Sequence, residues 1–172
     1  MGENENVFEN VSENVSENVL NDEMRIPLPE GFYVMSDEER NSISKGQTAP
    51  EWVMADKERH ILFSVSWKKL PSLASLMLGS KDMAKNMKKR YGEVAEGAGY
   101  TFGEIRQIMI GGEKAYGYPF GYETEGVAMC GDSIVVKRGK TCYFFHTYYR
   151  EAMKEESEKL LEELYESISF EG

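Results

Sequence analysis

The sequence contains few of the residues that usually carry catalysis or bind metals. Its 172 residues include two histidines, His60 and His146, and two cysteines, Cys130 and Cys142. Neither H-x-x-x-H nor C-x-x-C spacing occurs, so a zinc site is disfavoured. Glycine-rich dinucleotide-binding and Walker patterns are also absent, which disfavours a phosphate-binding loop. We therefore expect no metal and no cofactor.

Long apolar runs and a basic excess are also missing. No stretch of 18 or more apolar residues occurs, so we expect no membrane span. The first residues lack the basic and apolar segments of a secretory signal. We expect a cytoplasmic location for the chain as it stands, and an exported or envelope location if a signal peptide has been trimmed. The formal charge of −10 disfavours nucleic-acid binding, which needs basic surface.

The net negative charge is concentrated near the start of the chain, where residues 1–30 carry eight acids and one base. Residues 5–20 repeat Glu-Asn-Val four times at a spacing of four residues. The valines would stripe a helix, but Asn and Val are weak helix formers and the glutamates repel one another. We expect residues 1–23 to be a flexible or marginally helical arm, either a linker or a segment that folds on a partner. Residues 24–172 are expected to form the folded domain.

Alternating and helical patterns predict the order ββββαββββα within residues 24–172. In residues 61–67, large apolar side chains alternate with smaller or polar ones, which indicates a half-buried strand. Gly111-Gly112 predicts a hairpin between strands at 104–110 and 113–122. A second hairpin is predicted between residues 133–137 and 141–149, with apolar groups on both faces of the last strand. Hairpins favour an antiparallel sheet, and strands covered on both sides favour an α/β/α sandwich of the α+β class.

Two amphipathic helices are predicted, at residues 71–91 and 151–168. We expect Ser72 to cap the first helix and Gly79-Ser80 to kink or split it. Its apolar stripe is expected to comprise Leu73, Leu76, Met77, Met83, Ala84, Met87 and Tyr91. The stripe of the second comprises Met153, Leu160, Leu161, Leu164, Tyr165 and Ile168.

Several local signatures resemble the PsbP-like (Mog/PsbP) family, in particular its bacterial members of unknown function. They are the start at 26–32, the helix end at 87–91, the hairpin at 104–122 and the ending at 140–145 and 167–170. The resemblance spans residues 24–170 and implies the family's α/β/α fold. It also implies a binding or accessory role, since members include a regulator of the Ran GTPase, an extrinsic subunit of photosystem II and bacterial envelope proteins. The family has no shared catalytic motif, so no site residue is carried over.

Catalytic constellations are weak in this sequence. If the second hairpin is tight, Cys142 lies opposite roughly Val135, too far from Cys130 for a disulfide. Cys142 and His146 share one strand face about 13 Å apart, too far to form a nucleophilic pair. Cys130 with His146 stays conceivable. Asp132 could bind a cation with Glu123 or Glu125, although no ligand spacing supports this over a solvated loop.

One strand face and one helix face are candidate binding surfaces. At period two, Tyr116, Tyr118, Phe120 and Tyr122 project from one strand face. They form either core beneath a helix or an exposed surface for a partner or an apolar ligand. Pro119 indicates that this strand lies at an edge or ends early, which favours exposure. The first helix carries a basic face, which is either solvated or docks an acidic partner or the acidic arm: Lys81, Lys85, Lys88, Lys89 and Arg90.

Three functions follow, in order of preference. The first is a non-enzymatic binding or accessory protein with a protein partner. The second is a module that binds a small apolar ligand on the aromatic strand face; a deep pocket with convergent polar groups beside Tyr118 would favour it, and a flat exposed patch would favour the first. The third is an unrecognised hydrolase, which requires a titratable cluster in a cleft.

Overall fold

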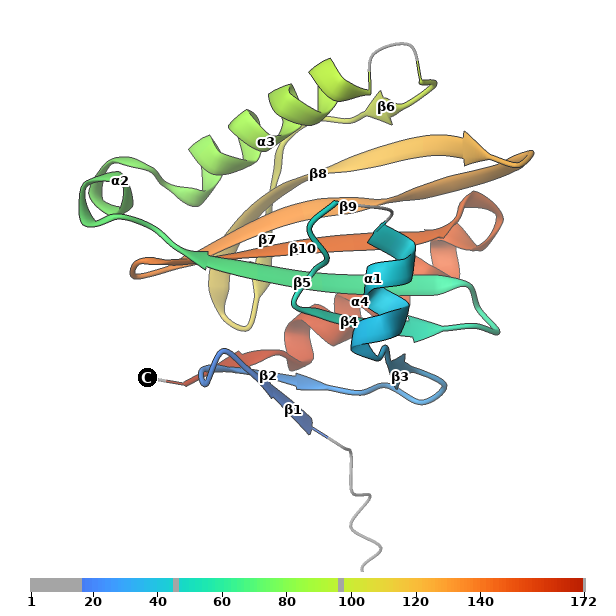
Figure 1. Ribbon diagram of the computed structural model, residues 1–172, viewed down its shortest axis with the longest axis horizontal. Helices are drawn as coiled ribbons and strands as arrows, with labels where there is room; N and C mark the ends of the chain where they lie inside the picture. The colour runs from blue at the N-terminus through green and yellow to red at the C-terminus, as the bar shows by residue number, and fades with distance from the viewer. Residues whose placement is uncertain (1–16, 45–46, 96–97, 172) are drawn as a thin grey trace, which may run out of the picture.

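A twisted antiparallel sheet forms the centre of the molecule (Figure 1). The computed structural model describes residues 17–44, 47–95 and 98–171. The strand order is β3-β4-β5-β10-β9-β8-β6, and β7 also pairs with β8. The strands are β3 (Tyr33–Val34), β4 (Trp52–Asp56), β5 (Ile61–Lys69), β6 (Thr101–Phe102), β7 (Arg106–Ile110), β8 (Glu113–Thr124), β9 (Val127–Arg138) and β10 (Thr141–Arg150). The predicted α+β class and mainly antiparallel sheet are confirmed.

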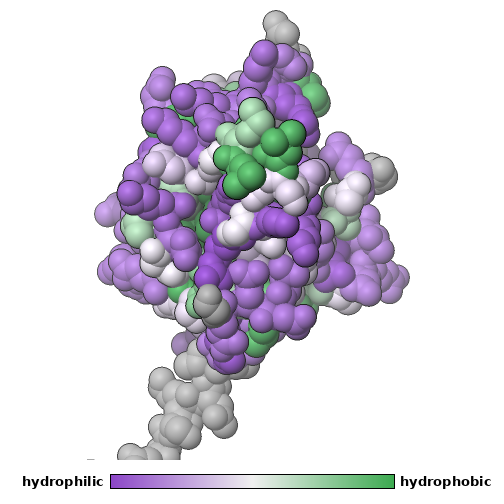
Figure 2. All heavy atoms as spheres, turned by 90° about the vertical axis from the view of Figure 1, so that its left-hand side faces the viewer, coloured by the Kyte–Doolittle hydropathy of each residue, from purple (hydrophilic) through white to green (hydrophobic). Residues whose placement is uncertain are grey.

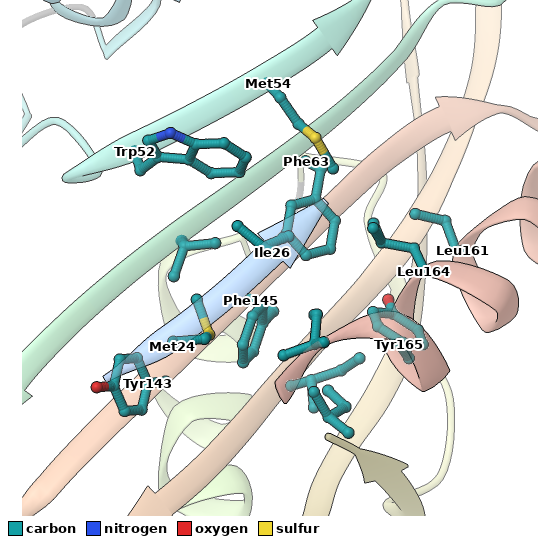
Figure 3. Close-up of a cluster of buried hydrophobic side chains, with 14 of the residues drawn as sticks. Met24, Ile26, Trp52, Met54, Phe63, Tyr143, Phe145, Leu161, Leu164 and Tyr165 are labelled. Atoms are coloured by element: carbon teal, nitrogen blue, oxygen red, sulfur yellow. The ribbon is translucent and has the colours of Figure 1, made fainter. Parts of the chain in front are cut away.

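One face of the sheet is covered by the last helix and a second, smaller sheet. Helix α4 (Lys154–Ser167) follows the short 3-10 turn η1 (Glu151–Met153). The small sheet has the order β1-β2-β11, with β1 at Glu17–Leu20, β2 at Met24–Pro27 and β11 at Ser169–Phe170. Apolar side chains of α4 and β2 meet those of the central strands in one continuous core (Figure 3).

That core follows from the predicted alternation. Phe63 and Val65 of β5, and Tyr143 and Phe145 of β10, all point to the α4 face and are fully buried there. Leu161 contributes from the helix. Burial of large apolar side chains is the main favourable term in folding, so this layer holds the domain together.

The opposite face is only partly covered by helices. Helix α3 (Ser80–Val94) lies over β8 and β9, where Met83 and Ala84 pack against Val135 and Cys142. Helix α2 (Ser72–Met77) precedes it, and helix α1 (Asp37–Ser44) lies in front of the β4 and β5 side of the sheet (Figure 1). Between α1 and α3 no described helix lies over β5 and β10.

The first predicted helix differs from expectation in two ways. It is split at Gly79, as the sequence indicated, but Ser72 is the first helical residue and makes no capping hydrogen bond. Residues Leu73, Leu76 and Met77 were predicted to be buried, and they are exposed. The split turns α2 away from the direction of α3, so its apolar side does not continue the buried stripe of α3.

The predicted hairpin turns are confirmed, and a further one joins β8 to β9. Gly111 and Gly112 have φ of 58° and 79°, as a two-residue hairpin turn requires. The further turn is at Glu125-Gly126 and lengthens β9 beyond its predicted start. Cys142 lies opposite Lys137 rather than Val135, Cys130 lies opposite Tyr149, and both thiols are free.

The expected division of the chain at residue 23 stays a prediction. Of residues 1–23 the structure describes only the last seven, and these form β1 and a turn that pair with the domain rather than extending from it. The repeat up to residue 16 lies outside the described residues. Within the described ranges, no helix is long and apolar enough to cross a bilayer.

Candidate ligand-binding groove

The aromatic face of β8 is largely core beneath α3. Tyr118 and Phe120 are buried, while Tyr116 and Tyr122 at either end are half-buried. The prediction that Pro119 marks an edge is wrong. Pro119 lies where the outer neighbour of β8 changes from β7 to β6, and its carbonyl accepts a hydrogen bond from the Gly103 N–H at 2.8 Å. Its missing N–H is therefore tolerated inside a paired strand.

The basic face predicted on the first helix lies on α3, opposite its buried side. Lys81, Lys85, Lys89 and Arg90 are exposed and Lys88 is half-buried. Within the described residues, none of these five side chains forms an ion pair. The basic surface faces solvent on the outer side of α3, and the aromatic strand face lies beneath the inner side of the same helix. The two candidate surfaces therefore do not form one site.

A groove of about 760 Å³ opens between α1 and α3, over the strands that no helix covers. Its floor comprises Ser64 and Ser66 of β5 and His146 and Tyr148 of β10. Ser64 lies opposite His146 in the sheet, and Ser66 lies opposite Phe144. The groove exists because two serines occupy positions where larger side chains would reach the helix layer, as Phe63 and Val65 do on the other face.

Tyrosine side chains form the wall of the groove on the α3 and β8 side. The wall contains Tyr91 of α3, Tyr100 and Tyr122. The Tyr100 and Tyr122 rings stack with centroids 4.9 Å apart and 19° between their planes. We call this site, formed by Ser64, Ser66, Tyr91, Tyr100, Tyr122, His146 and Tyr148, the aromatic groove.

The hydroxyls of these tyrosines converge. Burial raises the pKa of Tyr148, and the hydroxyls of Tyr91, Tyr122, Tyr100 and Tyr118 raise it further. Burial also raises the pKa of Tyr118 to about 12. The Tyr118 hydroxyl is buried and has no hydrogen-bond partner among the described residues. Aromatic faces and neutral hydroxyl groups therefore meet beside the groove.

His146 is held as a neutral imidazole at the floor. Its Nδ1 shares a hydrogen bond of 2.8 Å with the Ser133 hydroxyl, and Tyr91 meets its ring edge-on with centroids 5.9 Å apart. Burial lowers the pKa of His146 to about 4. At neutral pH the imidazole carries no charge, so the centre of the groove is polar and uncharged.

The charged residue at the groove margin is already paired. Burial alone would raise the pKa of Asp56, but hydrogen bonds from the backbone N–H and the guanidinium of Arg59 lower it overall. The Arg59 Nε lies 2.5 Å from the Asp56 carboxylate. His60, also at the margin, is exposed in the adjoining turn with φ of 57°. The groove therefore offers few free charges to a ligand.

The other residues weighed for catalysis lie elsewhere. Cys130 is on the α4 face of β9 whereas His146 is on the α3 face of β10, so that conceivable pair is excluded. Cys142 lies under α3, and its sulfur is 3.2 Å from the sulfur of Met83. Burial raises the pKa of the Cys130 thiol and of the Cys142 thiol. A raised pKa leaves less thiolate for nucleophilic attack.

Asp132 is committed to an internal ion pair rather than to a cation. Its carboxylate lies 2.7 Å from the Arg106 guanidinium, with little exposure. Burial raises its pKa, and Arg106 opposes that rise. Glu123 and Glu125 lie at the β8–β9 turn, beyond Asp132 along the strand pair. In residues 17–44, 47–95 and 98–171, no three His, Cys, Asp or Glu side chains gather as metal ligands would.

Most residues of the aromatic groove were not singled out from the sequence. Tyr91 was expected in a buried stripe, and Tyr100 was not considered. A signal was present in β5, where Ser64 and Ser66 are small side chains on a strand face that pairs with large aromatic ones. Small residues on the covered face of a central strand mark space that neighbouring layers need not fill.

The comparisons with known proteins identify the fold. No family model matches the chain, and no curated protein matches it. The solution structure of cyanobacterial PsbP (CyanoP) from Synechocystis sp. PCC 6803 aligns over 86% of both chains, with 15% identity and a TM-score of 0.61. LpqN of Mycobacterium tuberculosis, described as involved in cell envelope biogenesis, covers 87% of this chain and 83% of its own, with 14% identity and a TM-score of 0.57.

These likenesses confirm the predicted PsbP-like fold. The Saccharomyces cerevisiae Ran-binding protein Mog1p overlaps more loosely, with 11% identity and a TM-score of 0.48 over 86% of this chain and 83% of its own. At identities this low, the fold carries no activity from one protein to another. The function must therefore be argued from the groove and the surface of this chain.

Proposed function

We propose that this chain is a non-catalytic binding protein that holds an uncharged, ring-containing small molecule in the aromatic groove. The observation that carries the proposal is a groove of about 760 Å³ with tyrosine walls and a neutral histidine on its floor. This volume falls within the range of about 300–1,000 Å³ typical of small-molecule sites.

The lining favours a neutral ligand with a flat ring. Tyr100 and Tyr122 present stacked rings, against which another ring gains offset or edge contacts. The hydroxyls, Ser64 and His146 supply hydrogen bonds without a net charge. A charged ligand would leave water and find no free counter-charge beside the floor, which costs free energy.

This proposal changes the order of preference given by the sequence. A protein partner ranked first, because no catalytic constellation is evident, the start of the chain is acidic and the family resemblance implies an accessory role; a flat exposed aromatic patch would have favoured it further. Tyr118 and Phe120 are instead buried beneath α3, beside a groove with convergent polar groups. That geometry supports the small-ligand alternative, with Tyr122 and the neighbouring tyrosines as ligand contacts.

A non-catalytic role fits the state of the titratable groups. At neutral pH a histidine with a pKa of about 4 is not protonated to the imidazolium that would act as a general acid, and it is a weak general base. Its Nδ1 is bonded to Ser133, and Asp56 is bonded to Arg59. The groove thus has polar groups suited to orient a ligand. His146 and Asp56 are bonded to other partners rather than to each other, so they do not form a general acid–base pair.

The test is a titration of the labelled protein with 2-naphthol and with 2-naphthoate, followed by amide chemical shifts at pH 7. We expect 2-naphthol to shift amides of β5, β10 and α3 with a Kd of about 1 mM or below, since about eleven non-hydrogen atoms at roughly 0.4 kcal/mol each give about 4 kcal/mol. The naphthoate anion should bind at least about tenfold more weakly, because its charge has no partner there.

A variant that fills the groove supplies the control. Ser66→Trp should abolish the 2-naphthol shifts, whereas Met109→Trp, on the exposed edge strand β7, should leave them unchanged. Circular dichroism checks that both variants are folded. Absence of 2-naphthol binding, equal binding of the anion, or full binding by folded Ser66→Trp would each contradict the proposal.

A further inference from the structure

Helix α2 holds three apolar side chains in solvent at one end of the molecule. Leu73, Leu76 and Met77 are 70%, 86% and 72% exposed, and no residue of this helix is buried. Figure 2 faces this end, and apolar side chains gather there with hydrophilic atoms around them. Single exposed apolar residues are ordinary, but a cluster of this kind marks an interaction surface.

The helix is attached to the domain by its polar side. The Ser75 hydroxyl donates to the Gly139 carbonyl at 3.2 Å, and Lys140 Nζ donates to the Ser72 hydroxyl at 3.0 Å. Lys137 Nζ donates to the Ser75 carbonyl. These bonds join α2 to the β9–β10 turn and turn its leucines outward, the reverse of the usual amphipathic arrangement.

The stretch of sequence that contains this helix is basic, although the chain as a whole is acidic. Residues 68–90 contain seven bases and one acid, Asp82, although the whole chain has a net charge of −10. Lys137 and Lys140 are bonded to α2. The other flanking lysines form no ion pair among the described residues, and they are Lys68, Lys69, Lys81 and Lys85. Their charge is therefore available to an anionic partner.

We propose that Leu73, Leu76 and Met77 insert into the headgroup region of an anionic lipid bilayer while the flanking lysines contact lipid phosphates. The apolar side chains sit on a projecting helix, which suits insertion into a soft interface. Amphipathic helices with apolar residues on one side and lysines behind them bind such interfaces. Each lysine near an anionic surface strengthens binding about fivefold, so the charges set the preference for anionic lipid.

This surface is separate from the aromatic groove. The groove is lined by β5, β10 and the inner side of α3, whereas α2 projects beyond the end of the sheet (Figure 1). Docking through α2 would therefore leave the groove open, and either proposal can fail without the other.

Vesicle flotation tests the proposal with the full chain and two lipid compositions. We expect binding to vesicles of phosphatidylcholine and phosphatidylglycerol at a ratio of about 7:3, and at least about tenfold weaker binding to pure phosphatidylcholine. Raising sodium chloride from about 50 to 300 mM should weaken the binding severalfold, because it screens the lysines.

Matched substitutions separate the apolar tip from the rest of the surface. The triple change Leu73→Ser, Leu76→Ser and Met77→Ser should reduce anionic vesicle binding at least about tenfold, and the protein should stay folded because none of the three side chains is buried. The control triple, Val19→Ser, Val94→Ser and Met109→Ser, removes exposed apolar side chains elsewhere and should bind like the unmodified protein.

A depth probe distinguishes insertion from electrostatic contact. In the Leu76→Trp variant, brominated lipid in anionic vesicles should quench the fluorescence of the introduced side chain. In the Val94→Trp variant, the fluorescence should be quenched no more than that of the native tryptophans alone. No binding to anionic vesicles, equal binding by the serine triple, or an unquenched Leu76→Trp would overturn the proposal. So would a host protein that binds this tip when the vesicles do not.

Discussion

Protonation of His146 should destabilise the fold as the pH falls. The imidazole is half-buried at the floor of the groove, between Ser133, which bonds its Nδ1, and Tyr91, which meets its ring edge-on. From β5, Ser64 donates to the His146 carbonyl at 3.2 Å. The neighbours named here are neutral, so no carboxylate among them compensates a positive ring. Replacing His146 with Asn keeps a group that can bond Ser133 and removes the titration.

The magnitude follows from the two pKa values. Burial lowers the pKa of His146 from 6.5 in the unfolded chain to about 4 in the folded protein. The stability that depends on the neutral ring is therefore fully present above pH 6.5 and is lost as the pH falls from 6.5 toward 4. Between pH 7 and pH 5, this linkage amounts to about 2 kcal/mol.

Urea unfolding at pH 7 and pH 5, followed by tryptophan fluorescence, measures the effect. We expect the free energy of unfolding to fall by about 2 kcal/mol more in the unmodified protein than in His146→Asn. Asp132 and the other carboxylates contribute equally to both proteins and cancel in the difference. His60→Asn is the control, because the His60 side chain is exposed in the folded protein. Equal pH dependence in the unmodified protein and His146→Asn would refute the reasoning.

Two further substitutions probe packing next to the groove. Gly131→Ala should lower the free energy of unfolding by about 3 kcal/mol or more in urea titrations, because a Cβ there would lie 1.8 Å from the Thr147 carbonyl oxygen. Its control is Gly92→Ala on α3, where a Cβ would meet open space. That change should leave the free energy of unfolding unchanged or raise it by up to about 1 kcal/mol. Tyr118→Phe should leave the thermal midpoint unchanged or raise it, since the hydroxyl it removes is buried without a partner in the described structure; a drop of several degrees in scanning calorimetry would show that the hydroxyl is satisfied.

Strand alternation made the sheet predictable from the sequence. On β5, Phe63 and Val65 alternate with Ser64 and Ser66, so the two faces of the strand could be distinguished, and the first pair lies in the α4 core. On β10 both faces are apolar, which predicted only that both would be covered. Gly111-Gly112 defined its hairpin because few other residues adopt positive φ at two successive positions. The β8–β9 turn at Glu125-Gly126 carries a weaker version of the same signal and was missed.

The helix layer was less predictable because its burial depends on direction in space. Leu73, Leu76 and Met77 share the spacing of Met83 and Met87, so periodicity alone assigns all five to one buried stripe. The break at Gly79 changes the axis, and the two halves then face different surroundings. Periodicity identifies a face of a helix but does not say what covers it.

The aromatic groove could not be derived from the sequence for a related reason. Tyr91, Tyr100, Tyr122 and Tyr148 come from four separate segments, and their convergence depends on how α3 and the following loop lie on the sheet. His146 looked like an ordinary core residue in its strand. Its lowered pKa comes from burial by neighbours distant in sequence, which a local pattern does not record.

The small sheet has a practical consequence for experiments on this protein. Strand β2 pairs with β1 on one side and β11 on the other, and the Arg25 side chain bonds both Glu17 and Glu171. Residues 17 and 171 lie toward opposite ends of β2, since Glu17 pairs with Pro27 and Phe170 pairs with Met24, and both are on the side of the molecule away from α3 (Figure 1). Residue 171 also lies beside the β9–β10 turn, because its carbonyl accepts a hydrogen bond from Arg138, and α2 is bonded to the same turn. An affinity handle fused beyond residue 171 would therefore stand close to α2 while leaving the aromatic groove, on the opposite face of the sheet, open to a ligand. Ligand binding can then be measured on the immobilised protein, whereas vesicle binding is measured on the free protein.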